Sequence, residues 1–406
     1  MTLQIDFLPF ANDATSPNVV SQATWAAQAA GGYVQYGFSS GLAASNACNK
    51  AWRQSSVMTA ALANLMGNTL NQNVLDSGGA SSVSTLQTQL TNTIQALALI
   101  SQPAFIPQGR LTPTTTTPVI VADAISATSI FYTPYEGNSV PVYNGTSFLN
   151  LTFASDLALT LTSALTASSI VDVFAINASG SPALAWGPAW SVVTPGSCAR
   201  GTGAGTTALA RLNGLWTNAN TMTLYNGATT FTGVPVNQAT YLGSLAVDGT
   251  AGQVSCTVGY GQGRKFGVWN AYHRQPIILS AGDNTASWTG SGALRMMNGA
   301  SGNSAQIFCG LPEEWTAATQ YNKIAGSASA TFVFGVGLNS SSSIQGQSGA
   351  KSLPASNYNT LDEIWSYASF TPMLGVNMLN MLENNSSGAT SYGTSGNNVL
   401  TVAYRG

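Results

Sequence analysis

The hydrophobic pattern of this chain changes its period near residue 103. Before that point, apolar residues recur every three or four positions, a spacing that places them along one face of an α-helix. The pattern predicts three helices, over residues 19–30, 43–70 and 82–100. Either Ser16 or Ser21 can cap the amino terminus of the first one. We therefore expect the first hundred residues to be helical.

The third predicted helix has the most regular apolar stripe. Its positions alternate steps of three and four residues, the spacing of a coiled-coil seam: Val83, Leu86, Leu90, Thr93, Leu97 and Ile100. The stripe is shorter than three heptads, and Ser, Thr, Gln and Asn flank it where coiled coils usually carry Glu and Lys. A self-associating coil and an ordinary bundle helix both fit this pattern.

After Pro103 and Pro107, short β-branched or aromatic runs alternate with Gly, Asn, Pro and Ser. Such runs predict strands, at residues 118–122, 129–133, 139–143, 170–176, 276–279, 305–309, 330–336 and 398–404. Tight hairpin turns are expected at Asn144-Gly145, Asn213-Gly214 and Asn226-Gly227. Strands that recur about every ten residues favour an antiparallel sandwich or barrel over a parallel α/β fold.

Three segments of the second half have weaker signals. Residues 361–367 fit either a helical turn or an edge strand, and residues 339–343 and 384–396 are expected to be flexible surface loops. We find no repeat of fixed period, which argues against a solenoid.

The expected fold is mainly β with a helical amino-terminal segment. We predict a helical attachment or oligomerisation region at 1–102, a β-rich middle domain at 103–275 and a β-rich carboxy-terminal domain at 276–406.

Charged side chains are scarce. They make up 6% of the 406 residues, about a quarter of the usual share, whereas the hydrophobic share of 44% is ordinary. The net charge is −2, and no basic cluster exceeds Arg264-Lys265, which argues against binding to nucleic acid or an anionic membrane. No apolar run approaches the roughly 20 residues of a membrane span. With one histidine and 14 carboxylates, the chain is expected to be no enzyme, with no catalytic, metal-binding or cofactor-binding residues.

Two kinds of segment could in principle contribute reactive or binding groups, the cysteines and the glycine-rich runs. The cysteines (Cys48, Cys198, Cys256 and Cys309) are far apart in the sequence and are expected to be buried as small apolar side chains. The glycine-rich segments 201–206 and 259–263 lack the spacing of phosphate-binding loops, and we expect them to be hairpin tips.

Two acidic doublets, Glu313-Glu314 and Asp362-Glu363, raise the question of glycoside hydrolysis. That chemistry needs two carboxyl groups roughly 5–9 Å apart across a glycosidic bond. Neighbouring residues in a strand point to opposite faces, so neither doublet forms such a pair alone. A pair assembled across strands or between protomers stays open.

His273, beside Tyr272 and Arg274 and near Trp269, is expected to be a hydrogen-bonded histidine in a strand, since no nucleophile or metal partner is identified for it. Most tryptophans are expected in the core or between subunits, and any exposed one would suit stacking on a sugar ring. They include Trp186, Trp190, Trp216, Trp269, Trp288, Trp315 and Trp365. The sequence does not choose among them, so the binding residues are unknown.

A series of short strings lies at residues 7–11, 49–57, 128–137, 142–145, 172–177, 184–190, 200–203, 211–214, 241–243 and 266–274. In their sequence and order, these strings resemble tail-fibre or fibre-like virion proteins of tailed double-stranded-DNA phages and prophages. Together they cover most of residues 1–275, and the resemblance is looser beyond residue 276.

The resemblance implies a homotrimer in the virion, assembled in the cytoplasm of the bacterial host. Its amino-terminal part would attach to other proteins of the tail, baseplate or head, and its carboxy-terminal part would face outward. The Ser-, Asn- and Gly-rich segments 339–350 and 384–397 are the expected contacts with a host surface polysaccharide or another component of the host envelope. Two alternatives stay open: a head fibre or decoration protein, and a tail-spike polysaccharide depolymerase.

Overall fold

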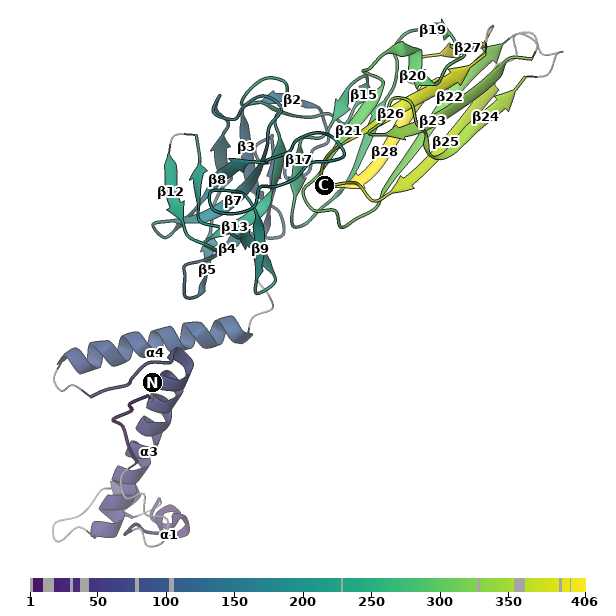
Figure 1. Ribbon diagram of the computed structural model, residues 1–406. Helices are drawn as coiled ribbons and strands as arrows, with labels where there is room; N and C mark the ends of the chain where they lie inside the picture. The colour runs from purple at the N-terminus through teal and green to yellow at the C-terminus, as the bar shows by residue number, and fades with distance from the viewer. Residues whose placement is uncertain are drawn as a thin grey trace. The chain divides into compact units, whose positions relative to one another are not determined.

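The computed structural model of this chain describes residues 3–9, 18–29, 32–36, 44–76, 80–101, 106–227, 229–326, 329–353, 362–386, 389–394 and 396–406. They belong to two compact units, Met1–Pro103 and Ala104–Gly406. Every described α-helix lies in the first unit and every described strand in the second (Figure 1). This confirms a mainly β chain with a helical amino-terminal segment.

The amino-terminal unit contains α1 (Gln22–Ala27), α2 (Tyr33–Tyr36), α3 (Ser45–Leu70) and α4 (Ala80–Ser101). Ser21 caps α1, because its Oγ accepts a hydrogen bond from the backbone N–H of Thr24 at 3.1 Å. The other predicted cap, Ser16, lies outside the described residues. Asn71 caps the carboxy terminus of α3. Its backbone is left-handed (φ 51°), and its N–H donates a hydrogen bond to the carbonyl of Gly67.

The core of the helical unit is small. The fully buried members of its apolar cluster are Ala63, Met66 and Val74, which pack against partly buried side chains of α4 and of the amino-terminal segment. That segment is held by a bridge in which the N–H of Val74 donates to the carbonyl of Gln4 at 2.9 Å. Much of the apolar surface of α3 and α4 is therefore not covered by the residues of this unit that the structure describes.

The β unit is built mostly from two sheets. The first runs in the order β12-β11-β8-β7-β13-β10-β9, with β17 also on β13. Its strands are β7 (Ile170–Ala178), β8 (Ser181–Ala189), β9 (Leu209–Leu212), β10 (Leu215–Asn218), β11 (Met222–Tyr225), β12 (Thr230–Val234), β13 (Ala239–Ala246) and β17 (Val268–Asn270).

The second and larger sheet runs in the order β15-β18-β28-β22-β25-β24-β23-β26-β21-β16, with β19, β20 and β27 beside it (Figure 1). Its strands are β15 (Tyr260–Gly261), β16 (Arg264–Lys265), β18 (Pro276–Ala281), β19 (Ser287–Thr289), β20 (Arg295–Met296), β21 (Ser304–Cys309), β22 (Thr316–Gly326), β23 (Thr331–Leu338), β24 (Gln345–Ser352), β25 (Asp362–Phe370), β26 (Gly375–Asn385), β27 (Ala389–Tyr392) and β28 (Asn398–Arg405). A 3₁₀ turn, η1 (Met297–Gly299), follows β20.

In a smaller sheet, β3 (Ser129–Pro134) lies between β1 (Gly109–Thr112) and β6 (Leu157–Thr160). Two further pairs are β2 (Ala124–Ala127) with β14 (Val254–Cys256) and β4 (Ser139–Tyr143) with β5 (Phe148–Thr152). Most pairs are antiparallel, as predicted; β15 with β18 and β16 with β21 are parallel. The three predicted Asn-Gly turns join β4 to β5, β9 to β10 and β11 to β12. At Asn213-Gly214 both residues have positive φ, 49° and 86°, as such a turn requires.

Three local predictions are wrong. Residues 118–122 form no strand, because the carbonyl of Pro118 instead accepts a hydrogen bond from Arg110 Nε at 2.9 Å. Strand β25 lies between β22 and β24, so its segment is neither a helical turn nor an edge strand, although Leu361 itself is outside the described residues. Within the expected loop 384–396, β27 pairs with β19 and β22, while residues 387, 388 and 395 are not described.

One core cluster runs through the whole β unit, from Leu111 to Tyr404. The chain divides after Pro103, close to the expected end of the helical region. Within Ala104–Gly406 it forms one compact unit, and β15 and β16 already belong to the larger sheet. A boundary at residue 275 stays a prediction.

Candidate functional site

The strongest candidate for a binding surface is the outer face of the larger sheet. Along β25, exposed residues alternate with residues that face the core, so that Glu363, Trp365 and Tyr367 share the outer face. In the register with β22, Tyr321 lies opposite Trp365, and Thr319 lies opposite Tyr367. We call this outer surface of β28, β22 and β25, from Trp315 to Trp365, the aromatic face.

The aromatic side chains at the β25 end are arranged as a platform. Trp365 is 61% exposed and Tyr367 is 46% exposed. The rings of Tyr321 and Trp365 are 4.7 Å apart between centroids and tilted by 47°. The Tyr321 hydroxyl donates to Glu363 Oε1 at 3.0 Å. Partial burial raises the pKa of Tyr321, and the accepting Glu363 carboxylate raises that pKa further, so the hydroxyl stays protonated as a donor.

Small and hydroxyl-bearing residues form the surface between the aromatic side chains. Thr319 pairs with Thr401 of β28, and Ala317 pairs with Ala403. On the other side of Ala317 lies Ser369 of β25. Because none of these side chains is large or charged, this part of the face is flat and polar without carrying charge.

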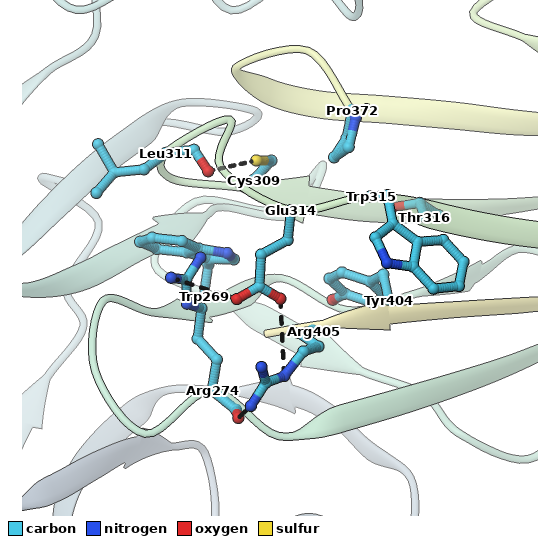
Figure 2. A pocket seen from close by; sticks show the side chains of 10 residues that line it. All are labelled: Trp269, Arg274, Cys309, Leu311, Glu314, Trp315, Thr316, Pro372, Tyr404 and Arg405. Carbon is cyan, nitrogen blue, oxygen red and sulfur yellow. Dashed lines mark hydrogen bonds and ion pairs between the residues drawn. The ribbon is translucent and has the colours of Figure 1, made fainter. Parts of the chain in front are cut away.

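The opposite end of the face is formed by Trp315, just before β22 and 66% exposed. Beside it, the Glu314 carboxylate forms ion pairs with Arg405 Nε at 3.6 Å and with Arg274 Nη2 at 3.4 Å. Figure 2 shows the Glu314 carboxylate directed toward these arginines and the indole of Trp315 directed away from them. The hollow drawn there has a volume of about 10 Å³, room for one water, so any ligand would lie on the open face.

The two acidic doublets do not come together in one chain. Glu313 and Glu314 precede β22, whereas Glu363 lies opposite Lys323 near the other end of that strand. Nine residues of strand separate these positions by roughly 30 Å, far more than the 5–9 Å of a glycosidase pair. At the far end, Asp362 pairs with Lys351, and that hydrogen bond holds the pKa of Asp362 below its usual value.

His273 is bonded on both sides of its ring. Its Nδ1 lies 3.1 Å from Glu136 Oε2, and its Nε2 lies 2.9 Å from the carbonyl oxygen of Pro107. The expected hydrogen bonding is therefore present. The expected strand is wrong, because His273 has a φ of 52° and lies in a bend after β17. Within the described ranges, no cluster of three or more His, Cys, Asp or Glu residues could hold a metal ion.

Neither glycine-rich segment resembles a phosphate site in the structure. Residues 201–206 form a loop before β9, with positive φ at Gly203 and Gly205. The segment 259–263 contains β15 and leads into β16. These strands pair with β18 and β21 and not with each other, so the segment is not the expected hairpin tip.

The cysteines are unpaired thiols. Cys198, Cys256 and Cys309 are buried, as predicted, whereas Cys48 is only partly buried. Burial raises the pKa of Cys256 and that of Cys309 to about 12, so both thiols stay protonated near neutral pH.

The tryptophans named from the sequence differ in burial in a way that the sequence did not distinguish, and Trp216 is partly buried. Trp186, Trp190, Trp269 and Trp288 are buried. Trp315 and Trp365 are exposed on the aromatic face. A usable signal was the spacing of Glu363, Trp365 and Tyr367 at every second position, which predicts one exposed side of a strand once the segment is recognised as β.

A second surface of interest lies on the helical unit. A groove of about 230 Å³ between α3 and α4 is lined almost entirely by apolar atoms, from residues that include Phe7, Leu62, Met66, Val83 and Leu90. Leu62 and Val83 of this lining are exposed, and further exposed apolar side chains of the same helices are Met58 and Leu65 on α3 and Ile94 and Leu97 on α4. No helix within the described part of the chain is both long enough and apolar enough to cross a membrane.

No family model and no curated protein matches this chain. Among solved structures, it is similar to a Bacillus thuringiensis Cry1Da tryptic core variant, with 7% identity over 90% of this chain and 72% of that chain and a TM-score of 0.19. It is also similar to infectious bursal disease virus strain Gx, with 11% identity over 77% of this chain and 76% of that chain and a TM-score of 0.24. Both TM-scores are too low to support an argument about fold or function.

Proposed function

We propose that this chain is a structural subunit of a phage virion, a tail-fibre or fibre-like appendage that assembles as a homotrimer through its helical unit. The observation that carries the proposal is the uncovered apolar surface of α3 and α4. The resemblance to fibre proteins supports the place on a virion and the number of copies.

The helical unit covers too little of its own apolar surface. The six exposed side chains along α3 and α4 present roughly 500 Å² of apolar surface, at the upper end of what monomers usually expose. A standard interface buries about 800 Å² on each partner. The groove between the helices adds a hollow that apolar side chains of another copy would fill. A second and third copy of this chain are therefore the occupants that we propose.

The charge pattern of α4 favours association of identical chains. The helix has 22 residues and no charged side chain. Its exposed apolar side is formed by Val83 and Ile94, each 58% exposed. Because identical helices bring identical charges together, a helix without charge meets a copy of itself without electrostatic repulsion. The seam positions Leu86 and Leu90 pack against Ala63 and Met66 within the chain, so the exposed Val83 and Ile94 are the positions left for contact with a copy.

The test compares the mass of the full chain with that of two single variants. Ile94→Asp places a carboxylate in the proposed interface, and Thr88→Asp places the same group about 120° away from it around α4. We expect Ile94→Asp to sediment as a monomer and Thr88→Asp to keep the mass of the unmodified chain. Circular dichroism of both variants is the control for loss of the helices, and we expect both spectra to match that of the unmodified chain. An oligomer that survives Ile94→Asp contradicts the proposed interface.

The position on the virion is tested separately, by electron cryomicroscopy of the intact particle. Density for the helical unit against the tail or baseplate supports a tail fibre, and density on the head supports the head-fibre alternative. The separation of the acidic doublets within one chain favours binding over hydrolysis. Release of oligosaccharide from host capsule or lipopolysaccharide by the purified chain would instead support the depolymerase alternative.

A further inference from the structure

We propose that the aromatic face binds a neutral saccharide built from pyranose rings, which lies along β22 between Trp365 and Trp315. This inference goes beyond the proposed function, because the whole site belongs to one chain and needs neither the trimer nor the virion.

The exposed rings suit the apolar side of a sugar. A pyranose presents C–H groups on its faces and hydroxyl groups around its edge, so a flat aromatic ring with polar neighbours complements it. Trp365 and Tyr367 supply such rings on adjacent positions of one strand face. Tyr321 packs against Trp365, and the bond from its hydroxyl to Glu363 fixes its ring before any ligand arrives. Little ordering of side chains is then needed on binding.

The surface between the two ends offers partners for hydroxyl groups. Thr319, Thr401 and Ser369 carry hydroxyls that both donate and accept hydrogen bonds. Gln347 of β24 pairs with Tyr367 and extends this polar row. The six residue steps from Trp315 to Tyr321 span roughly 20 Å. The face therefore has the length of a short linear oligosaccharide with an aromatic ring near each end.

The charges around the face favour a neutral ligand over an anionic one. Glu314 is already paired with Arg405 and Arg274. At the other end, Lys351 is paired with Asp362. The two members of each pair neutralise each other. Between the two ends, Glu363 lies opposite Lys323 in the register, and the remaining positions from Tyr321 to Ala317 carry no charge. An acidic polysaccharide would need a cluster of basic side chains along its path.

The exposed area argues against a protein partner here. Trp365 and Tyr367 together expose roughly 250 Å², about a third of what each partner contributes to a standard interface. Trp315 does not enlarge this patch, because hydroxyl-bearing residues lie between it and the two rings. The helical unit, by contrast, exposes more large apolar side chains, among them Met58 on α3 and Val83 and Ile94 on α4.

Calorimetric titration of the full chain at millimolar ligand tests the inference. The probes are neutral hexasaccharides of α-1,4-glucose, β-1,4-glucose and β-1,4-N-acetylglucosamine, with hexagalacturonate as an anionic comparison. We expect at least one neutral probe to bind and hexagalacturonate to bind more weakly. Binding of none of the neutral probes, or preference for hexagalacturonate, overturns the inference.

Variants locate the site. Trp365→Ala should weaken binding by about tenfold or more, while Tyr321→Phe, which keeps the ring, should weaken it less. Tyr225→Ala is the matched control, since Tyr225 is an exposed aromatic residue of the other large sheet. If Trp365→Ala leaves the affinity unchanged, the site is wrong. If Trp365→Ala instead changes the mass of the protein in solution, the face is an interface between copies of the chain, which also contradicts the site. Ile94→Asp should keep its affinity per chain, so failure of the trimer and failure of this site are distinguishable.

Discussion

A buried ion pair gives the sharpest prediction about what stabilises the β unit. Asp172 of β7 has no exposed side-chain surface, and Arg200 is 10% exposed. Arg200 Nε lies 2.7 Å from Oδ2 of Asp172, and its Nη2 lies 2.9 Å from Oδ1, a two-point contact. Thr207 Oγ1 and Ser244 Oγ donate to the same carboxylate at 2.6 and 2.5 Å. Each acceptor oxygen of Asp172 is therefore used twice.

The guanidinium depends on this carboxylate. Burial would lower the pKa of Arg200, but the charge of Asp172 outweighs burial and raises that pKa above its usual value. Asp172→Ala leaves a buried cation whose remaining contacts are neutral: the carbonyl of Gly310, the Tyr241 and Ser244 hydroxyls, and the rings of Trp190 and Tyr241. Removing one partner of a buried pair costs about 3–5 kcal/mol of unfolding free energy. We expect a loss of this size.

A double-mutant cycle measures the pair itself. Urea unfolding of the full chain, followed by tryptophan fluorescence, gives the free energies for Asp172→Ala, Arg200→Met and the double variant. We expect the double variant to lose less than the sum of the single losses, by about 2 kcal/mol or more. A loss below about 1 kcal/mol in Asp172→Ala, or strictly additive losses, would refute this account of the network.

Two further predictions concern stability of the same unit. Burial alone would raise the pKa of Asp283, but hydrogen bonds from Asn303 Nδ2, Thr285 and Asn298 outweigh it and hold that pKa below its usual value. This stabilisation is present above the unfolded pKa and is lost as pH falls through the folded pKa. The urea concentration at the unfolding midpoint should therefore decrease as the pH is lowered below about 4, and it should decrease less in Asp283→Asn. Identical pH profiles for the two proteins would contradict this. Gly375→Ala should destabilise the unit by more than about 1 kcal/mol, because Gly375 has a φ of 82° and an added Cβ would lie 2.3 Å from Cys198 Cβ; a melting temperature equal to that of the unmodified chain would contradict it.

The sequence was most informative where local chemistry decides the conformation. The helical stripes predicted α3 and α4, and the Asn-Gly pairs predicted hairpins, because both signals act within a few residues. The segments that became β24 and β27 were not recognised, since their Gly, Ser, Thr and Ala residues resemble those of a loop. They are strands because neighbouring strands bond their backbones, which no local pattern reveals.

The candidate site shows the same limit. The sequence shows which residues of the aromatic face are tryptophans and tyrosines. It does not show that they lie side by side on one exposed face, because that depends on the register of β22 against β25. That register joins residues more than forty positions apart, such as Tyr321 and Trp365. The contact between Asp172 and Arg200 likewise links segments that the sequence gives no reason to pair.

The central claim is that the helical unit joins identical chains, and the mass of the full chain in solution tests it most directly. Sedimentation velocity at micromolar concentration should give a single species of three times 41.7 kDa. A species of 41.7 kDa that persists across the concentration range would contradict the claim.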